Sequence, residues 1–252
     1  MGQDVSVNLV AGLHNVRLAL ENGQIPMLEI LIDAGRDDQR ISEIISLATK
    51  RGISLRKVAK RKLDEQAPGV KHQGVIARLD GSPRDKRQGI ETILSGLDHD
   101  PMLLVLDGVK DPHNLGACLR SADGAGVDAL IVPENRACGM TPVVSKVAAG
   151  AAHTVPLVVV TNIASALKDL KQRGLWIVGA SDDAPATLWE SDLSGPLAIV
   201  LGGEEGGLRD LTRRHCDFMV GVPMRGVVES LNVSVAAALV MYEALRQRRI
   251  KN

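Results

Sequence analysis

The sequence predicts an α/β protein with a mainly parallel sheet in a larger C-terminal domain and a small α/β unit before it. After residue 100, apolar runs of strand length alternate with helical patterns, which is typical of a parallel sheet covered on both faces. Before residue 81, a shorter stretch mixes strand and helix patterns. The chain has 252 residues, 45% of them apolar, so it can bury a sizeable core.

The N-terminal unit, residues 1–80, is expected to fold as a small α/β domain. Hydrophobic periodicity predicts helices at 7–20 and 41–51 and strands at 27–32 and 74–79. Seven basic residues and no acidic residue fall between Lys50 and Lys62. They form either a solvated helix face and loop or a phosphate-binding patch, and both interpretations stay open.

Residues 81–100 are interpreted as a linker, because 81–89 is polar, rich in turn-forming residues and without periodicity. The larger domain, residues 101–252, is expected to contain six strands, at 102–106, 129–132, 157–160, 175–178, 197–201 and 218–222. Helices are expected between most of them, for example at 115–126, 143–150 and 163–173. An amphipathic helix over 230–249 is expected to close the chain.

Composition excludes one class of RNA-binding protein and leaves others open. The four aromatic residues, Trp176, Trp189, Phe218 and Tyr242, are too few for an RNA reader that stacks bases on aromatic rings. Thirty basic residues balance thirty acidic ones, which argues against a nucleic-acid partner only as a whole-chain average. Residues 1–80 carry twelve basic and ten acidic residues, so a positive surface can be local.

The cysteines and apolar runs indicate a reduced, cytoplasmic protein. Cys118, Cys138 and Cys216 are odd in number and widely spaced, so neither a disulfide framework nor a metal site is expected. No signal peptide is visible, and no apolar run approaches the ~18 residues of a membrane span. No catalytic triad is suggested by the scattered histidines, which are His14, His72, His99, His113, His153 and His215.

Three segments lie where ligands of open parallel sheets bind, at the carboxyl ends of strands. In 107–122 a strand ends in an acidic loop with glycine and proline. Asn114 is a suitable N-cap for the next helix, and Arg120 lies about one and a half turns into it. A structural interpretation, with Asn114 as a cap and Arg120 as a surface charge, stays open for this segment taken alone.

The second and third segments are glycine-rich. Residues 201–208 place four glycines in six positions but match neither a dinucleotide fingerprint nor a P-loop. Two adjacent carboxylates, Glu204 and Glu205, favour a neutral or cationic ligand there. In 222–234, Ser230 is a suitable cap for the terminal helix, whereas that interpretation leaves Asn232 unexplained.

Together these segments resemble the three signature motifs of the SpoU-type methyltransferases of the SPOUT superfamily. The matching residues are Asn114-x-Gly116 with Arg120-Ser121-Ala122, Leu201-Gly202-x-Glu204, and Pro223-Met224-x-Gly226 with Ser230-Leu231-Asn232-Val233-Ser234. Residues 12–16 and 72–76 resemble the family's small ribosomal-protein-like, substrate-binding domain. Residues 107–123 are similar to the branch that methylates a guanosine 2′-hydroxyl in the peptidyl-transferase centre of 23S rRNA.

The resemblance implies a deep trefoil knot, a bent S-adenosylmethionine as cofactor, 23S rRNA as substrate and a homodimer. Cofactor contacts would fall at Gly202, Val222 and Leu231. The working residues would be Asn114, Arg120, Glu204, Ser230 and Asn232. One residue departs from the family, which most often has glycine where this chain has Glu205. If that position needs a positive φ, Glu205 costs about 1 kcal/mol or more.

The implied reaction is in-line attack of the ribose 2′-oxygen on the sulfonium methyl group. Positioning alone can contribute ~7–11 kcal/mol. Arginine is a poor base, so either the RNA phosphate assists loss of the proton or Arg120 stabilises the developing alkoxide. We favour the second, with Glu204 orienting Arg120 or Asn114. Three alternatives remain: the same reaction on a tRNA or another rRNA site, a non-catalytic knotted RNA-binding or ribosome-assembly protein, and a dehydrogenase, which the missing fingerprint disfavours.

Overall fold

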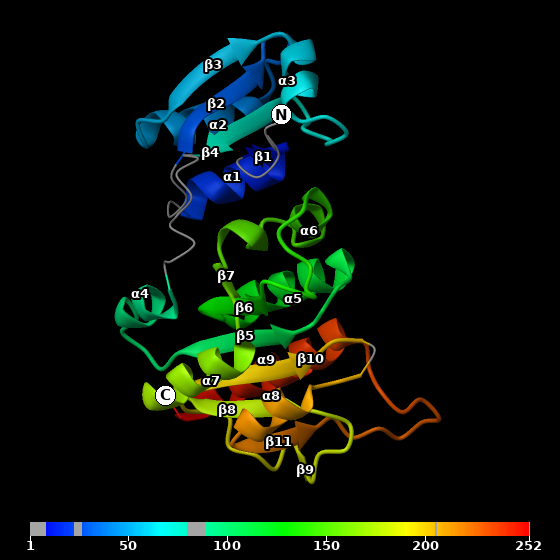
Figure 1. The fold of residues 1–252 in the computed structure, drawn as a ribbon. Coiled ribbons are helices and arrows are strands. Elements are labelled where there is room, and N and C mark those ends of the chain that lie inside the picture. The colour runs from blue at the N-terminus through cyan, green and yellow to red at the C-terminus, as the bar shows by residue number, and fades with distance from the viewer. Residues whose placement is uncertain (1–8, 23–26, 80–88, 205, 252) are drawn as a thin grey trace. The chain divides into compact units, whose positions relative to one another are not determined.

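The computed structural model describes residues 9–22, 27–79, 89–204 and 206–251. The chain divides into two compact units, Met1–Pro83 and Arg84–Asn252. Each unit has its own sheet and its own helices (Figure 1), and the two are described separately. The polar 81–89 segment lies outside the described residues except for Gly89.

The N-terminal unit is a four-stranded sheet in the order β1-β4-β2-β3. Its core lies between the sheet and α1 and α2, where Val16, Leu20, Ile30 and Ile44 are almost fully buried. The elements are β1 (Leu9–Ala11), α1 (Leu13–Asn22), β2 (Met27–Asp33), α2 (Gln39–Lys50), β3 (Ser54–Val58), α3 (Lys60–Gln66) and β4 (Val75–Leu79).

Two expectations for this unit are wrong. The helix predicted over 7–20 begins only at Leu13, because Leu9–Ala11 pairs antiparallel with β4 and Gly12 turns the chain with a φ of +98°. The interpretation of Lys50–Lys62 as a helix face and loop, one of the two left open, omits the edge strand β3, which pairs parallel with β2. Both strands are stabilised by distant partners, which local periodicity does not report.

The C-terminal unit contains a seven-stranded sheet in the order β7-β6-β5-β10-β8-β11-β9. All its neighbouring pairs are parallel, which confirms the predicted α/β class. The strands are β5 (Met102–Asp107), β6 (Ala129–Pro133), β7 (Leu157–Val160), β8 (Trp176–Ala180), β9 (Ala186–Thr187), β10 (Leu197–Gly202) and β11 (Phe218–Gly221). The trefoil knot stays a prediction.

Helices cover both faces of this sheet, as Figure 1 shows. The helices are α4 (Ile90–Ser95), α5 (Pro112–Ala125), α6 (Pro142–Val147), α7 (Ile163–Gln172), α8 (Asp210–His215) and α9 (Val233–Lys251), with a 3₁₀ turn at Ala151–His153. Alternate residues of β5 point to opposite faces. Leu104 and Leu106 join the core beneath α5 and α9, whereas Leu103 and Val105 join the core beneath α7.

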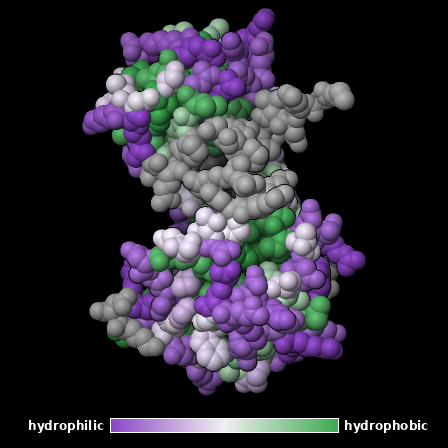
Figure 2. Space-filling view, turned by 60° about the vertical axis from the view of Figure 1, so that its left-hand side comes forward, coloured by the Kyte–Doolittle hydropathy of each residue, from purple (hydrophilic) through white to green (hydrophobic). Residues whose placement is uncertain are grey.

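The short elements β9, α4 and α8 are additions to the predicted set. Helix α4 lies inside the 81–100 segment, and its Ile90, Ile93 and Leu94 pack against the core beneath α7. Hydrophilic side chains cover most of the visible face of each unit, with hydrophobic side chains in limited areas (Figure 2). Among the described helices, none combines the length and apolarity that a bilayer crossing requires.

Candidate functional site

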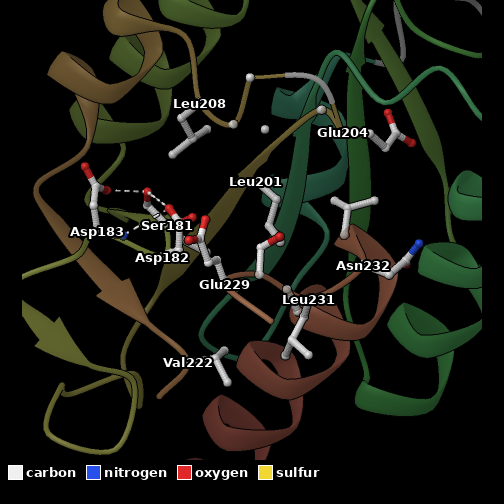
Figure 3. A pocket seen from close by; sticks show the side chains of 18 of the residues that line it. Ser181, Asp182, Asp183, Leu201, Glu204, Leu208, Val222, Glu229, Leu231 and Asn232 are labelled. Atoms are coloured by element: carbon white, nitrogen blue, oxygen red, sulfur yellow. Dashed lines mark hydrogen bonds between the residues drawn. The ribbon is translucent and has the colours of Figure 1, made fainter. Parts of the chain in front are cut away.

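A pocket of about 740 Å³ lies at the carboxyl edge of the C-terminal sheet. The segments after β8, β10 and β11 and the start of α9 form its walls. Figure 3 shows Leu201, Leu208, Val222 and Leu231 among its apolar side chains. It also shows Asp182, Asp183 and Glu229 grouped away from Glu204 and Asn232. We call this cavity the glycine-loop pocket, after residues 202–207.

Gly202 has no room for a side chain. A Cβ atom on Gly202 would lie 1.9 Å from the backbone carbon and oxygen of Gly207. The loop therefore folds back directly onto the end of β10, and Gly203 and Gly207 form a β-bridge. This close approach presents backbone atoms to the pocket, as a glycine-rich loop can.

A chain of hydrogen bonds joins residues of all three sequence motifs. Nδ2 of Asn232 donates to Oδ1 of Asn114 at 3.0 Å, and Nδ2 of Asn114 donates to Oε1 of Glu204 at 2.7 Å. Oδ1 of Asn232 accepts from the backbone N–H of Ser234 at 2.9 Å, which fixes the Asn232 amide. Asn232 therefore orients the Asn114 amide, and the Asn114 N–H in turn fixes one oxygen of the Glu204 carboxylate.

Both expected helix caps belong to other residues. Asp111 caps α5, because its Oδ1 accepts from the backbone N–H of His113 at 2.9 Å. Asn114, expected as the cap, lies inside the helix and is buried. Asn232 rather than Ser230 caps α9, which begins at Val233. The cap role explains the Asn232 that the sequence left unexplained.

The electrostatics of the pocket are mainly acidic. Asp182, Asp183, Glu204 and Glu229 line it, against a single lining arginine, Arg213. The Arg213 guanidinium donates to Oδ2 of Asp183 at 3.0 Å, and this bond holds the pKa of Asp183 below its usual range. The remaining carboxylates favour a ligand with a positive centre.

Sequence reasoning missed the acidic segment 181–183. A signal for it existed, because the segment comes shortly after the strand predicted at 175–178 and therefore lies at the ligand-binding edge. Its residues do not belong to any of the three motifs, so no pattern singled them out.

The buried thiol on α5 is not a nucleophile. Burial, with the nearby Glu204 charge adding to it, raises the pKa of Cys118 to about 12. The thiol is therefore protonated at neutral pH and belongs to the apolar core beneath α5.

The structure places six of the eight predicted site residues around the pocket: Gly202, Glu204, Val222, Ser230, Leu231 and Asn232. Asn114 touches two of them through the hydrogen bonds above. Arg120 stands apart. It is exposed on α5, about 9 Å along the helix axis from Asn114, and no described residue forms an ion pair with it. Glu205 lies outside the described residues.

Within the described ranges, no group of three or more histidine, cysteine, aspartate or glutamate side chains is arranged to hold a metal ion. The arrangement can bind a compact ligand that combines an apolar part with a cationic centre. The carboxylate at Glu204 and the amide at Asn114 would stand beside it.

Comparison with known proteins identifies relatives over both units. The model of the "SpoU rRNA Methylase family" matches residues 101–242, and a model described as "RNA 2'-O ribose methyltransferase substrate binding" matches residues 9–84. The 23S rRNA (guanosine-2'-O-)-methyltransferase RlmB of Pectobacterium atrosepticum is 45% identical over 95% of this chain and 98% of its own length. The RlmB protein of Shewanella oneidensis is 46% identical, and the match covers 96% of this chain and 98% of that protein.

Solved structures show the same architecture. The SpoU methyltransferase AviRb from Streptomyces viridochromogenes, in complex with the cofactor AdoMet, is 26% identical with a TM-score of 0.78, and the match covers 96% of this chain and 90% of AviRb. The crystal structure of an RNA 2'-O ribose methyltransferase is 30% identical with a TM-score of 0.72. That match covers 96% of this chain and 88% of the other protein.

Proposed function

The chain belongs to the SpoU rRNA methylase family, and on that premise we propose that it methylates the 2′-hydroxyl of a guanosine in 23S rRNA with S-adenosylmethionine. The observation that carries the proposal is the hydrogen-bonded chain Asn232–Asn114–Glu204 beside the glycine-loop pocket. These hydrogen bonds join residues from all three motifs. The polypeptide that carries the motifs aligns with its relatives over nearly its full length. We place the target guanosine in the peptidyl-transferase centre and the reaction in the cytoplasm.

The pocket fits the cofactor on two counts. Its backbone cradle at Gly202 is one that a Cβ atom would fill, and its carboxylates suit a sulfonium. Leu201, Val222 and Leu231 would hold the apolar part of the molecule, and the loop backbone at Gly202 would hold its polar edges. When bound, S-adenosylmethionine supplies a methyl group that is already activated.

The protein's own residues then have to place the ribose and assist the loss of its proton. Glu204, fixed by Asn114, supplies an oriented carboxylate beside the pocket. Arg120 is exposed and can approach the RNA, where its guanidinium would stabilise the negative charge that develops on the 2′-oxygen. Ser230 lines the pocket and would help to shape it.

We propose that the protein acts as a homodimer through α9. Val235, Leu239 and Tyr242 are 47%, 40% and 50% exposed and follow one another at helical spacing, so they form an apolar stripe on one face. Light scattering on the purified protein tests this. We expect a dimer for the wild type and a monomer for Leu239→Lys, and a monomeric wild type would contradict the proposal.

The experiment for the main proposal is transfer of a labelled methyl group from S-adenosylmethionine to unmodified 23S rRNA, followed by mapping of the modified nucleotide. We expect label on a guanosine ribose in the peptidyl-transferase centre. Label on tRNA or at another rRNA site would show that the proposed substrate is wrong and the proposed reaction is right. Failure to bind the cofactor in a titration would favour a non-catalytic RNA-binding protein.

A further inference from the structure

A second cavity lies on the same edge of the C-terminal sheet. It measures about 590 Å³, and the segments after β5, β6 and β7 form its walls, together with Arg209, Leu211 and Thr212. We call it the arginine pocket, because Arg136 and Arg209 line it. None of its lining residues belongs to the predicted site.

The two pockets are neighbours along the edge. The glycine-loop pocket uses strands β10, β8 and β11, and the arginine pocket uses β7, β6 and β5, so the sheet order joins them where β5 pairs with β10. The backbones that separate them are in contact. A Cβ atom on Gly203 would lie 2.4 Å from the carbonyl oxygen of Gly108. A polymer that enters one pocket therefore passes close to the other.

A buried carboxylate fixes one of the two arginines. The Asp107 side chain is 0% exposed, and its Oδ1 lies 3.3 Å from Nη1 of Arg209. Oδ2 accepts from Oγ1 of Thr212 at 2.6 Å, whereas Oδ1 has no hydrogen bond among the described residues. A buried carboxylate oxygen that accepts no hydrogen bond attracts the nearby guanidinium strongly. Asp107 therefore acts as a positioning residue for Arg209.

The other walls add positive potential. Helix α7 points its amino end into the pocket, where Asn162, Ile163 and Ala164 line the cavity. Oδ1 of Asn162 caps the helix, since it accepts from the backbone N–H of Ser165 at 3.1 Å. The amino end of a helix carries a partial positive charge, which favours an anion in the cavity. Arg136 is exposed, so its charge is available to a ligand. Arginine, an exposed hydroxyl at Thr161 and a helix amino end together select a phosphate.

We propose that the arginine pocket binds a phosphate group of the RNA strand close to the methylated nucleotide. The proposal rests on the proposed function, because it takes RNA as the ligand. Arg136 and Arg209 would contact the phosphate oxygens, and Asp107 would keep Arg209 in place. The pocket would thereby set the register of the strand, so that one ribose enters the catalytic site.

The test compares Arg136→Ala and Arg209→Ala with a charge-matched control, Arg249→Ala. Arg249 is exposed near the end of α9, where its neighbour Arg248 contacts the backbone of Asp100 and Pro101, before β5. The control therefore removes one positive charge from the opposite edge of the sheet. Affinity for a 23S rRNA fragment with the target guanosine is measured over a series of salt concentrations, and cofactor affinity by calorimetry.

We expect each pocket variant to bind the RNA about tenfold more weakly. The slope of log affinity against log salt should fall by roughly 0.7–0.9. The control and the cofactor affinity should stay within about twofold of the wild type. Ethylation interference adds a position-specific readout: one phosphate near the target should block binding by the wild type when ethylated, and Arg136→Ala should lose that sensitivity.

The proposal would be overturned if both pocket variants matched the wild type in RNA affinity, in salt slope and in interference pattern. If Arg209→Ala does not fold, because Asp107 loses its partner, Arg136→Ala decides the result, since Arg136 is exposed. Methyl transfer by the wild type is measured in parallel. If the wild type is active and the Arg136→Ala and Arg209→Ala variants bind RNA as it does, only the arginine-pocket proposal is refuted. If the wild type binds no RNA, both proposals are refuted.

Discussion

Asn114 shows how far a single residue can be predicted. Its place in a motif after a strand predicts a role at the carboxyl edge, and the structure puts its amide between Asn232 and Glu204, 118 and 90 residues away. The cap interpretation is wrong because Asp111 and Pro112 begin the helix one turn earlier. Local pattern identifies the residue, but only the fold supplies its partners.

Arg120 carries the first prediction at this scale. Arg120→Ala should lower kcat by on the order of 10²–10³, the usual cost of removing one donor that stabilises a developing oxyanion. Cofactor affinity should not change, because Arg120 does not line the glycine-loop pocket. Single-turnover methyl transfer and a cofactor titration measure the two effects, with Arg249→Ala as control. Turnover like that of the wild type would remove Arg120 from the mechanism.

His99 carries a prediction about pH. Its Nδ1 lies 3.2 Å from Oδ1 of Asp98 and its Nε2 lies 2.9 Å from Oδ1 of Asp128, and these contacts raise the pKa of the imidazole above 6.5. Because the folded pKa is raised, the stabilisation is complete below the unfolded pKa and is lost as pH rises through the folded value.

The free energy of unfolding at a series of pH values measures this effect. His99→Gln should remove the part of the decline that begins near pH 6.5. The effect should be small, because the His99 side chain is 52% exposed and solvent screens it. A pH profile of the variant that runs parallel to that of the wild type across this range would contradict the assignment.

At the scale of elements, predictability follows how local the stabilising contacts are. Helix α7 is predicted closely, because its apolar period and its Asn162 cap lie within the segment. Strand β3 is missed, because it carries Arg56 and Lys57 at the edge of a sheet and exists through its pairing with β2. The same holds for β1, whose partner β4 lies more than sixty residues later.

The glycine loop carries the prediction at this scale. Gly202→Ala should abolish cofactor binding and lower the melting temperature, because its Cβ atom would collide with the Gly207 backbone at 1.9 Å. Gly206→Ala is the matched control in the same loop, since its Cβ atom would meet nothing within 4 Å. Calorimetry with S-adenosylmethionine and thermal unfolding measure both variants. Equal cofactor affinity for the two would show that the close approach at Gly202 does not matter.

At the scale of the whole molecule, the parallel sheet and the convergence of the three motifs follow from the sequence and its resemblance to a family. The acidic segment 181–183 and the arginine pocket do not, because each is assembled from residues that carry no pattern of their own. These residues come together because of the order in which the strands lie in the sheet. That strand order is set by the complete sheet and not by any single segment. A sequence that alternates strands and helices is compatible with several orders.

The balance of charge over the two units carries the last prediction. Between Lys50 and Lys62, Arg56 is paired with Glu29 and Arg61 with Glu65, whereas Lys57, Lys60 and Lys62 are exposed on β3 and α3. The triple variant Lys57→Gln, Lys60→Gln, Lys62→Gln should therefore weaken binding of 23S rRNA. The slope of log affinity against log salt should fall by up to about 2–3, because roughly 0.7–0.9 is lost for each of three phosphate contacts.

Cofactor affinity should stay unchanged in this variant, because every residue that lines the glycine-loop pocket belongs to the other unit. The matched control removes three exposed charges from the C-terminal unit, with Lys168→Gln, Arg214→Gln and Arg249→Gln, and should retain most of the RNA affinity. Filter binding over a salt series and calorimetry separate the two effects. If both triple variants lose the same affinity and slope, RNA responds only to net charge, and the β3–α3 surface has no particular role in binding.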